Sequence, residues 1–88
     1  MIIRSQCKTM ILNMECIATI YIHELEYVDT KRILFNIETD KGFLGKYSTE
    51  EKAIKVLDMI QSAYVELNLN YPQYVANGYF EMPQDSEV

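Results

Sequence analysis

One amphipathic helical pattern stands alone in this sequence, and the residues before it alternate with the period of β-strands. Within residues 49–68, apolar side chains recur at every third or fourth position, at Ala53, Leu57, Ile60, Tyr64 and Leu67. This spacing places them on one side of a helix and leaves the charged side chains on the other. We therefore expect one helix with a single apolar face, which must be buried against a sheet or another helix.

The start of this helix carries a capping signal. Ser48 is followed three positions later by Glu51, which is the spacing of a capping box. In that motif the serine hydroxyl accepts the backbone N–H of residue 51, and the glutamate side chain reaches back to the N-cap. Glu50 and Glu51 also suit the positive end of the helix dipole. The sequence therefore predicts Ser48 as the N-cap.

The segments before the helix are typical of short strands. The expected strands cover residues 2–5, 9–13, 16–24, 31–39 and 43–46. Ile20 and Ile22 share one face of the pleat, and Tyr21 and His23 share the other. Gly42 supplies a tight turn between the last two strands. The predicted fold class is α+β, with a small antiparallel sheet of four to six short strands packed by one amphipathic helix in two layers.

Length and composition favour one small domain. The chain has 88 residues, of which 49% are hydrophobic, so we expect a single domain over residues 1–88 with a modest core. Residues 84–88 are expected to form a disordered acidic tail. No apolar run approaches the roughly 18 residues needed to cross a bilayer, and the first residues lack the pattern of a secretory signal. We therefore expect a cytoplasmic protein in which Cys7 and Cys16 are free thiols.

The charges and the reactive side chains exclude several functions. Thirteen Asp and Glu against eight Lys and Arg give a net charge of −5, which argues against general binding of nucleic acid. His23 is the only histidine, and Cys7 and Cys16 lack the paired spacing of zinc ligands. No serine or cysteine stands in a nucleophile motif, and the three glycines form no phosphate loop. We expect no enzymatic activity, no metal and no cofactor, and we interpret His23 as a half-exposed strand residue.

Cations in the strand half of the chain suggest a ligand site. Arg4, Lys8 and Arg32 lie near expected strand ends or turns, and Tyr21 lies on an expected strand. If the fold brings them together, the cations could bind phosphate and the tyrosine could stack on a base. The alternative is a set of scattered, solvated charges. The hypothesis is a pocket for a phosphorylated small molecule.

A neutral, tyrosine-rich segment follows the helix. Residues 67–80 contain no charged side chain but include Tyr71, Tyr74 and Tyr79. Asn77 and Gly78 are the preferred pair for a tight hairpin turn. Because tyrosine is enriched in protein interfaces, these three residues are candidates for partner binding; the alternatives are core cover or a self-association surface. Small sheets with a free edge also associate readily, so we expect a homo-oligomer.

Four stretches of sequence together resemble a known group of proteins. They are residues 3–6 (IRSQ), residues 44–53 (LGKYSTEEKA), residues 56–61 (VLDMIQ) and residues 82–85 (MPQD). The chain resembles a family of small, mostly uncharacterised proteins carried by phages and mobile elements of Firmicutes. It departs from that pattern at Cys7, where an acidic turn residue is expected, and in the longer segment between the helix and the final strand.

The resemblance implies a biological setting and no catalytic residues. Small accessory proteins of phages often act by stoichiometric binding, including antagonism of bacterial defence. On that basis we expect a non-enzymatic protein that binds and sequesters a cyclic-nucleotide immune signal in the host cytoplasm. The alternatives are a protein–protein inhibitor or adaptor that binds a host defence protein, including inhibition of the anti-CRISPR type, and a structural homo-oligomer.

Overall fold

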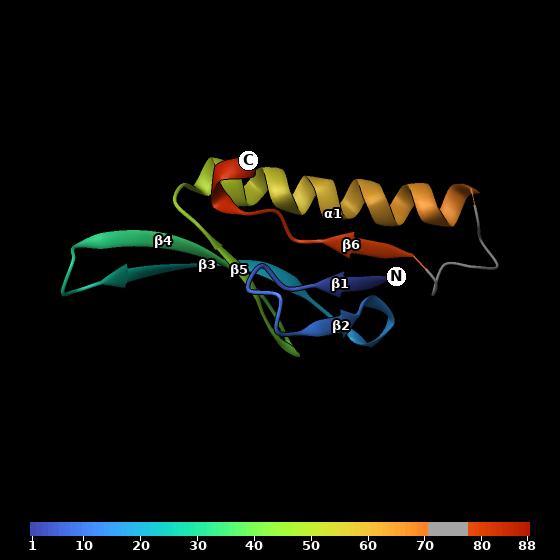
Figure 1. The fold of residues 1–88 in the computed structure, drawn as a ribbon, viewed down its shortest axis with the longest axis horizontal. Coiled ribbons are helices and arrows are strands. Elements are labelled where there is room, and N and C mark those ends of the chain that lie inside the picture. Colours follow the sequence, from blue (N-terminus) through green and yellow to red (C-terminus); the bar gives the residue numbers. More distant parts are fainter. Residues whose placement is uncertain (71–77) are drawn as a thin grey trace.

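The strands and the helix form two layers. The computed structural model describes residues 1–70 and 78–88 of the chain. Along these residues the elements are β1 (Ile2–Arg4), β2 (Ile11–Asn13), β3 (Ile20–Tyr27), β4 (Arg32–Thr39), β5 (Gly42–Tyr47), α1 (Glu50–Asn70) and β6 (Tyr79–Glu81). The helix lies across one side of the strands (Figure 1). The predicted α+β class, with one helix on short strands, is confirmed.

The strands divide into two sheets of three strands each among the described residues. One sheet has the order β3-β4-β5 and is antiparallel throughout. The other has the order β2-β1-β6, and β6 pairs with β1 in parallel. The strand predicted around Tyr79 is therefore present, but its described partner is β1. Its expected hairpin partner, residues 74–76, lies outside the described residues.

The β4–β5 turn is held by one threonine side chain. Thr39 Oγ1 accepts the backbone N–H groups of Lys41 and Gly42 at 3.0 and 2.9 Å. Gly42 has a φ of +155°, and a Cβ there would lie 3.2 Å from the Met10 sulfur. The predicted need for glycine in this turn therefore comes from the backbone conformation, since the end of the flexible Met10 side chain would have to give by only a few tenths of an ångström.

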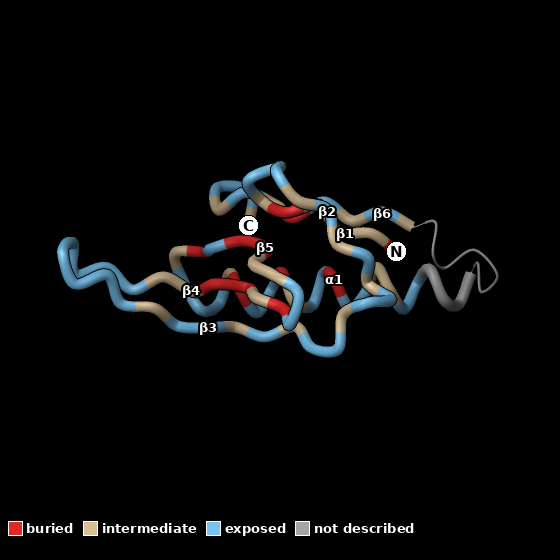
Figure 2. Tube along the Cα trace, turned by 90° about the horizontal axis from the view of Figure 1, so that it is seen from below, coloured by how far each residue is buried: buried red, intermediate tan, exposed pale blue. Residues whose placement is uncertain are grey.

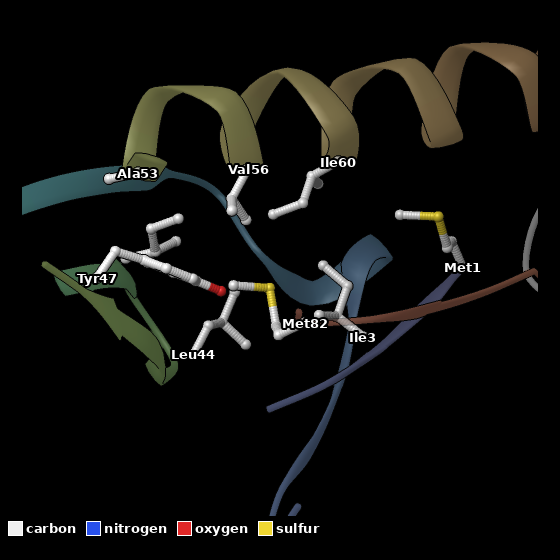
Figure 3. Packing of buried hydrophobic residues seen from close by; sticks show 9 residues of the cluster. Met1, Ile3, Leu44, Tyr47, Ala53, Val56, Ile60 and Met82 are labelled. Atoms are coloured by element: carbon white, nitrogen blue, oxygen red, sulfur yellow. The ribbon is translucent and has the colours of Figure 1, made fainter. Parts of the chain in front are cut away.

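The core lies between α1 and the two sheets. Its buried side chains come from both ends of the chain and from the middle: Met1, Ile3, Ile37, Leu44, Tyr47, Ala53, Val56, Ile60 and Met82 (Figure 3). Ala53 and Ile60 belong to the predicted apolar stripe of the helix, and Val56 widens it. Leu57 and Tyr64 are packed at the margin of the core and are partly buried. The helix therefore buries one face, as its periodicity predicts.

Two local predictions need correction. The N-cap of α1 is Thr49, whose Oγ1 accepts the backbone N–H of Lys52 at 3.1 Å. Ser48 instead donates its hydroxyl to Asp85. The predicted capping role of this hydroxyl is therefore replaced by a contact with a residue that is distant in the sequence. The third expected strand begins at Ile20 and not at residue 16, because Met14–Cys16 forms a 3-10 turn.

Residues 84–88, predicted as a disordered acidic tail, are docked in the structure. Asp85–Glu87 forms a 3-10 turn, and Val88 packs against the core. The Asp85 side chain binds Ser48 and Lys52 at the start of α1. These contacts tie the end of the chain to the first turn of the helix.

The molecule is elongated, because the β3–β4 hairpin extends past the start of α1 (Figure 1). The principal extents are 48 × 21 × 20 Å. β5 pairs with β4 only from Phe35 to Thr39, so the hairpin continues beyond that point as two strands alone. We call residues 25–34 the arm. In the part of the chain that the structure describes, no helix is long and apolar enough to span a membrane.

Candidate ligand-binding face of the β3–β4–β5 sheet

The side of this sheet that faces away from α1 gathers polar and aromatic side chains. Side chains alternate between the two faces along each strand, and cross-strand partners share a face. The register therefore puts Tyr21 in a row with Glu38, and His23 in a row with Asn36 and Lys46. Figure 2 views the sheet from the side opposite α1, and no described element passes in front of β3 and β4. We call this the outer face.

Glu38 is the centre of a hydrogen-bond cluster on the outer face. Tyr21 donates its hydroxyl to Oε1 over 3.4 Å, and Asn36 donates Nδ2–H to Oε2 over 3.3 Å. His23 Nδ1 lies 3.1 Å from the same Oε2. Partial burial raises the pKa of Glu38, but the hydrogen bonds from Asn36, His23 and Tyr21 together outweigh it and leave the pKa below its usual value. Glu38 is therefore an ionised acceptor that orients its three neighbours.

Asn36 carries an unmade hydrogen bond. The residue is only 5% exposed, and its Oδ1 is buried without a partner among the described atoms. A buried acceptor without a donor costs about 1–3 kcal/mol. Asn36 sits on the central strand, between His23 and Lys46 in the register. A ligand N–H group that passes the side chains of His23 and Lys46 and donates to this oxygen would remove that cost.

Cations lie beyond this cluster, toward the arm. Lys46 Nζ lies 3.5 Å from the Tyr27 hydroxyl and 5.5 Å from the centre of its ring. Arg32 is the cross-strand partner of Tyr27. The two cations outnumber the single carboxylate of Glu38 on this face. The outer face is therefore not acidic, although the whole chain carries a net charge of −5.

The structure separates the four residues predicted to bind a ligand. Tyr21 and Arg32 share the outer face, toward opposite ends of the β3–β4 pair. Arg4 and Lys8 belong to the other sheet and its β1–β2 turn, where Arg4 donates to the Lys8 carbonyl over 2.9 Å and Lys8 forms an ion pair with Glu81. The four therefore do not form one pocket within a single chain, because the two pairs stand on different sheets.

The candidates for partner binding are placed only in part. Tyr71 and Tyr74 lie outside the described residues. Tyr79 begins β6 and is 55% exposed, with Ile2 as its cross-strand partner. Tyr79 is thus accessible on the surface. Partner binding by Tyr71, Tyr74 and Tyr79 stays a prediction.

Sequence reasoning missed most of the outer-face cluster. It assigned Tyr21 and His23 to one pleat face and noted the alternation of residues 31–39, but not which residues lie opposite one another. That register depends on the length of the β3–β4 turn, which includes Lys31 at a φ of 54°. The sequence shows that Asn36 and Glu38 share one face of their strand. Only the pairing of β3 with β4 shows that this face is also the face of His23.

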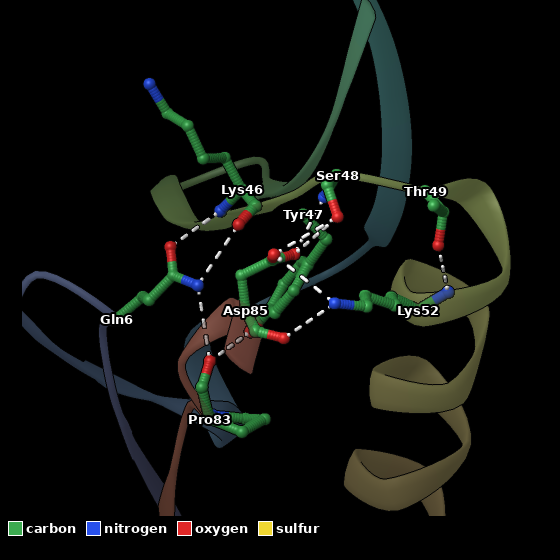
Figure 4. Close-up of polar contacts among 8 residues, drawn as sticks. All are labelled: Gln6, Lys46, Tyr47, Ser48, Thr49, Lys52, Pro83 and Asp85. Atoms are coloured by element: carbon green, nitrogen blue, oxygen red, sulfur yellow. Dashed lines mark hydrogen bonds and ion pairs between the residues drawn. The ribbon is translucent and has the colours of Figure 1, made fainter. Parts of the chain in front are cut away.

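Three stretches noted in the sequence, residues 3–6, 44–53 and 82–85, meet in space. Gln6 binds the backbone of Lys46 through both ends of its amide, at 2.9 and 3.1 Å, and also donates to the Pro83 carbonyl (Figure 4). The same carbonyl accepts the hydroxyl of Tyr47 at 2.8 Å. These residues join β1, β5 and the C-terminal segment. These three stretches therefore have a structural role at this junction.

Cys7 is an exposed thiol in the β1–β2 turn. Its sulfur lies 3.4 Å from Ser5 Oγ and 2.9 Å from Thr9 Oγ1. Hydrogen bonds from Ser5 and Thr9 lower the pKa of Cys7 to about 7. The thiol is therefore partly ionised at neutral pH. Within residues 1–70 and 78–88, no group of three His, Cys, Asp or Glu side chains could hold a metal ion.

Comparison with protein-family models, with curated proteins and with solved structures found no match.

Proposed function

We propose that this protein is a non-catalytic binding protein that captures a small nucleotide-type ligand on the outer face of the β3–β4–β5 sheet. The observation that carries the proposal is the buried, unpartnered Oδ1 of Asn36 beside the ionised Glu38. Both groups accept hydrogen bonds, and nucleobases supply N–H donors. A ligand that donates to Asn36 would complete the one unmade bond in the cluster.

The surrounding side chains suit the remaining parts of such a ligand. Tyr21 and Tyr27 are exposed on the same face of β3, and aromatic rings bind planar bases by stacking. Lys46 and Arg32 lie on the neighbouring strands, where they could bind phosphate oxygens through charge-assisted hydrogen bonds. The ligand would thus place its base near Asn36 and its phosphate toward the arm.

The family resemblance supplies the biological context of the proposal. A binder carried by a phage or mobile element would lower the free concentration of a cyclic-nucleotide immune signal in the host cytoplasm. Stoichiometric capture needs no reactive group, only an affinity that matches the concentration of the signal. Recovery of the ligand in unchanged form would show that the protein captures it and does not convert it.

The test is a binding screen with matched variants. The purified protein is titrated calorimetrically with cyclic and linear nucleotides, and a bound ligand is recovered by heat and identified by mass. We expect Tyr21→Ala and Lys46→Ala to raise the Kd at least tenfold, because both side chains are exposed on the outer face. Tyr79→Ala and Lys55→Ala remove the same side-chain types elsewhere and serve as controls. Absence of binding to every nucleotide, or equal loss in the controls, would contradict the proposal.

A further inference from the structure

We infer that two copies of this chain pair through the outer edges of their β3 strands, and that each arm then covers an apolar hollow on the other copy. The inference concerns a surface other than the outer face and does not depend on the proposed function. It combines three features of one chain, which are an open strand edge, an uncovered arm and an unfilled hollow.

The edge of β3 is open. Among the described residues, β3 pairs only with β4 and has no backbone partner on its other side. Its eight residues, Ile20–Tyr27, read IYIHELEY and contain no proline, glycine or lysine. The one register shift of this sheet lies between β4 and β5. Glu24 and Glu26 are the charged side chains that restrict pairing at this edge, but an edge without proline or a bulge still offers a continuous row of backbone groups for strand addition.

The arm is short of partners in a single chain. Val28 is 85% exposed and Ile33 is 46% exposed. A two-stranded ribbon without a covered face is only marginally stable in water. The radius of gyration of 13.6 Å also exceeds the roughly 12 Å expected for a compact chain of this length. The arm therefore has the composition and the shape of an element that is covered by another molecule.

An apolar hollow lies at the opposite end of β3. It has a volume of about 380 Å³ and lies between α1 and the beginning of β3. Its apolar lining comes from Met14, Ile20, Leu57, Ile60, Tyr64 and Val65. In an antiparallel pair of β3 strands, the arm of one copy runs toward the Ile20 end of the other. The same pairing that uses the free edge thus brings the arm, with its exposed Val28 and Ile33, beside the apolar hollow.

Charge selects the register of this pairing. A symmetric antiparallel pair centres on one residue, and the two registers of greatest overlap centre on His23 or on Glu24. Centring on Glu24 would place two carboxylates directly opposite each other, which destabilises a strand pair. Centring on His23 places Glu24 opposite Ile22 of the second copy and Glu26 opposite its Ile20. The pairing centred on His23 is therefore favoured, and both α1 helices then lie on the same side of a continuous six-stranded sheet.

Oligomeric state tests the inference directly. The full chain is studied by sedimentation velocity from about 1 to 100 µM, and we expect a species of twice the 10.3 kDa chain mass. Val28→Asp should raise the dimer Kd at least tenfold, because it replaces the exposed apolar side chain of the arm with a carboxylate. Ile54→Asp changes an exposed isoleucine of α1 and should leave the Kd unchanged. A wild-type protein that is monomeric at 100 µM would overturn the inference.

Cross-linking tests the register. In a background of Cys7→Ser and Cys16→Ser, His23→Cys should form an intermolecular disulfide on mild oxidation, because residue 23 lies opposite itself. Glu26→Cys lies opposite Ile20 and should stay reduced under the same conditions. A dimer that does not cross-link through position 23, or that cross-links equally through position 26, would show that the copies pair in another way.

Discussion

Removal of the Asp85 carboxylate tests whether the docked C-terminal segment stabilises the fold. The carboxylate accepts the backbone N–H of Ser48 at 2.8 Å and its hydroxyl at 3.0 Å, and it lies 3.3 Å from Lys52 Nζ. Hydrogen bonds to charged groups contribute about 1.5–3 kcal/mol each. Because the Asp85 side chain is 42% exposed, we take the low end of that range for each bond, and we take only a few tenths of a kcal/mol for the ion pair.

Asp85→Ala should therefore lower the free energy of unfolding by about 3 kcal/mol at pH 7. For a chain of this size that loss corresponds to a fall of about 12–24 °C in Tm. Asp58→Ala removes an exposed carboxylate from α1 and should change stability by less than about 0.5 kcal/mol. Both variants are compared with the wild type by calorimetry and by urea denaturation. A fall in Tm of less than about 3 °C for Asp85→Ala would refute the argument.

The pH dependence of the same variant gives an independent check. The backbone N–H of Ser48, its hydroxyl and Lys52 hold the pKa of Asp85 below its usual value. A carboxyl whose folded pKa is lowered contributes its stabilisation fully above its unfolded pKa of about 3.9, and loses it as pH falls through the folded pKa. The difference in stability between wild type and Asp85→Ala should thus be constant from pH 5 to 8 and shrink toward pH 3. A difference that stays constant into acid would mean that the carboxylate charge is not involved.

Three further predictions concern the core, the helix cap and the exposed thiol. Ile60→Ala should cost about 2–5 kcal/mol in urea denaturation, because this buried side chain lies between α1 and the sheets; a loss below about 1 kcal/mol would contradict the packing. Thr49→Ala should cost about 1 kcal/mol through loss of the N-cap, and the loss should persist in a background of Ser48→Ala if Thr49 alone caps the helix. Alkylation of Cys7 by iodoacetamide should reach half its maximal rate near pH 7, and Ser5→Ala should move that midpoint upward; an unchanged midpoint would show that the Ser5 hydroxyl does not stabilise the thiolate.

The succession of strands and helix along the chain could be predicted from the sequence, but the division of the strands into two sheets and the parallel β1–β6 pair could not. Periodicity is a local property, and a helix with one apolar stripe must bury that stripe against the rest of the chain. The predicted helix, residues 49–68, differs from α1 (Glu50–Asn70) by one or two residues at each end. The hairpin at Gly42 was predictable for the same reason, since its turn residues are adjacent in the sequence.

The outer-face cluster and the C-terminal junction were not predictable from local patterns. Asn36 and Glu38 meet His23 only through the β3–β4 register, and that register depends on the conformation of a turn. Gln6 meets Pro83 across most of the length of the chain. The Ser48 hydroxyl binds Asp85 instead of capping the helix because this distant carboxylate is within reach.

The sequence alone determined the fold class, the single helix and the local turns, because each depends on neighbouring residues and on the periods of helix and strand. The tertiary structure decided which polar groups share a face, which cations stay apart and where the end of the chain docks. Those outcomes depend on contacts between residues that are distant in sequence, and a hydrogen bond forms only where the whole fold brings donor and acceptor within about 3 Å. For this reason Arg4 donates to the carbonyl of Lys8, and Lys8 forms an ion pair with Glu81. Glu38 contacts His23 on the other sheet.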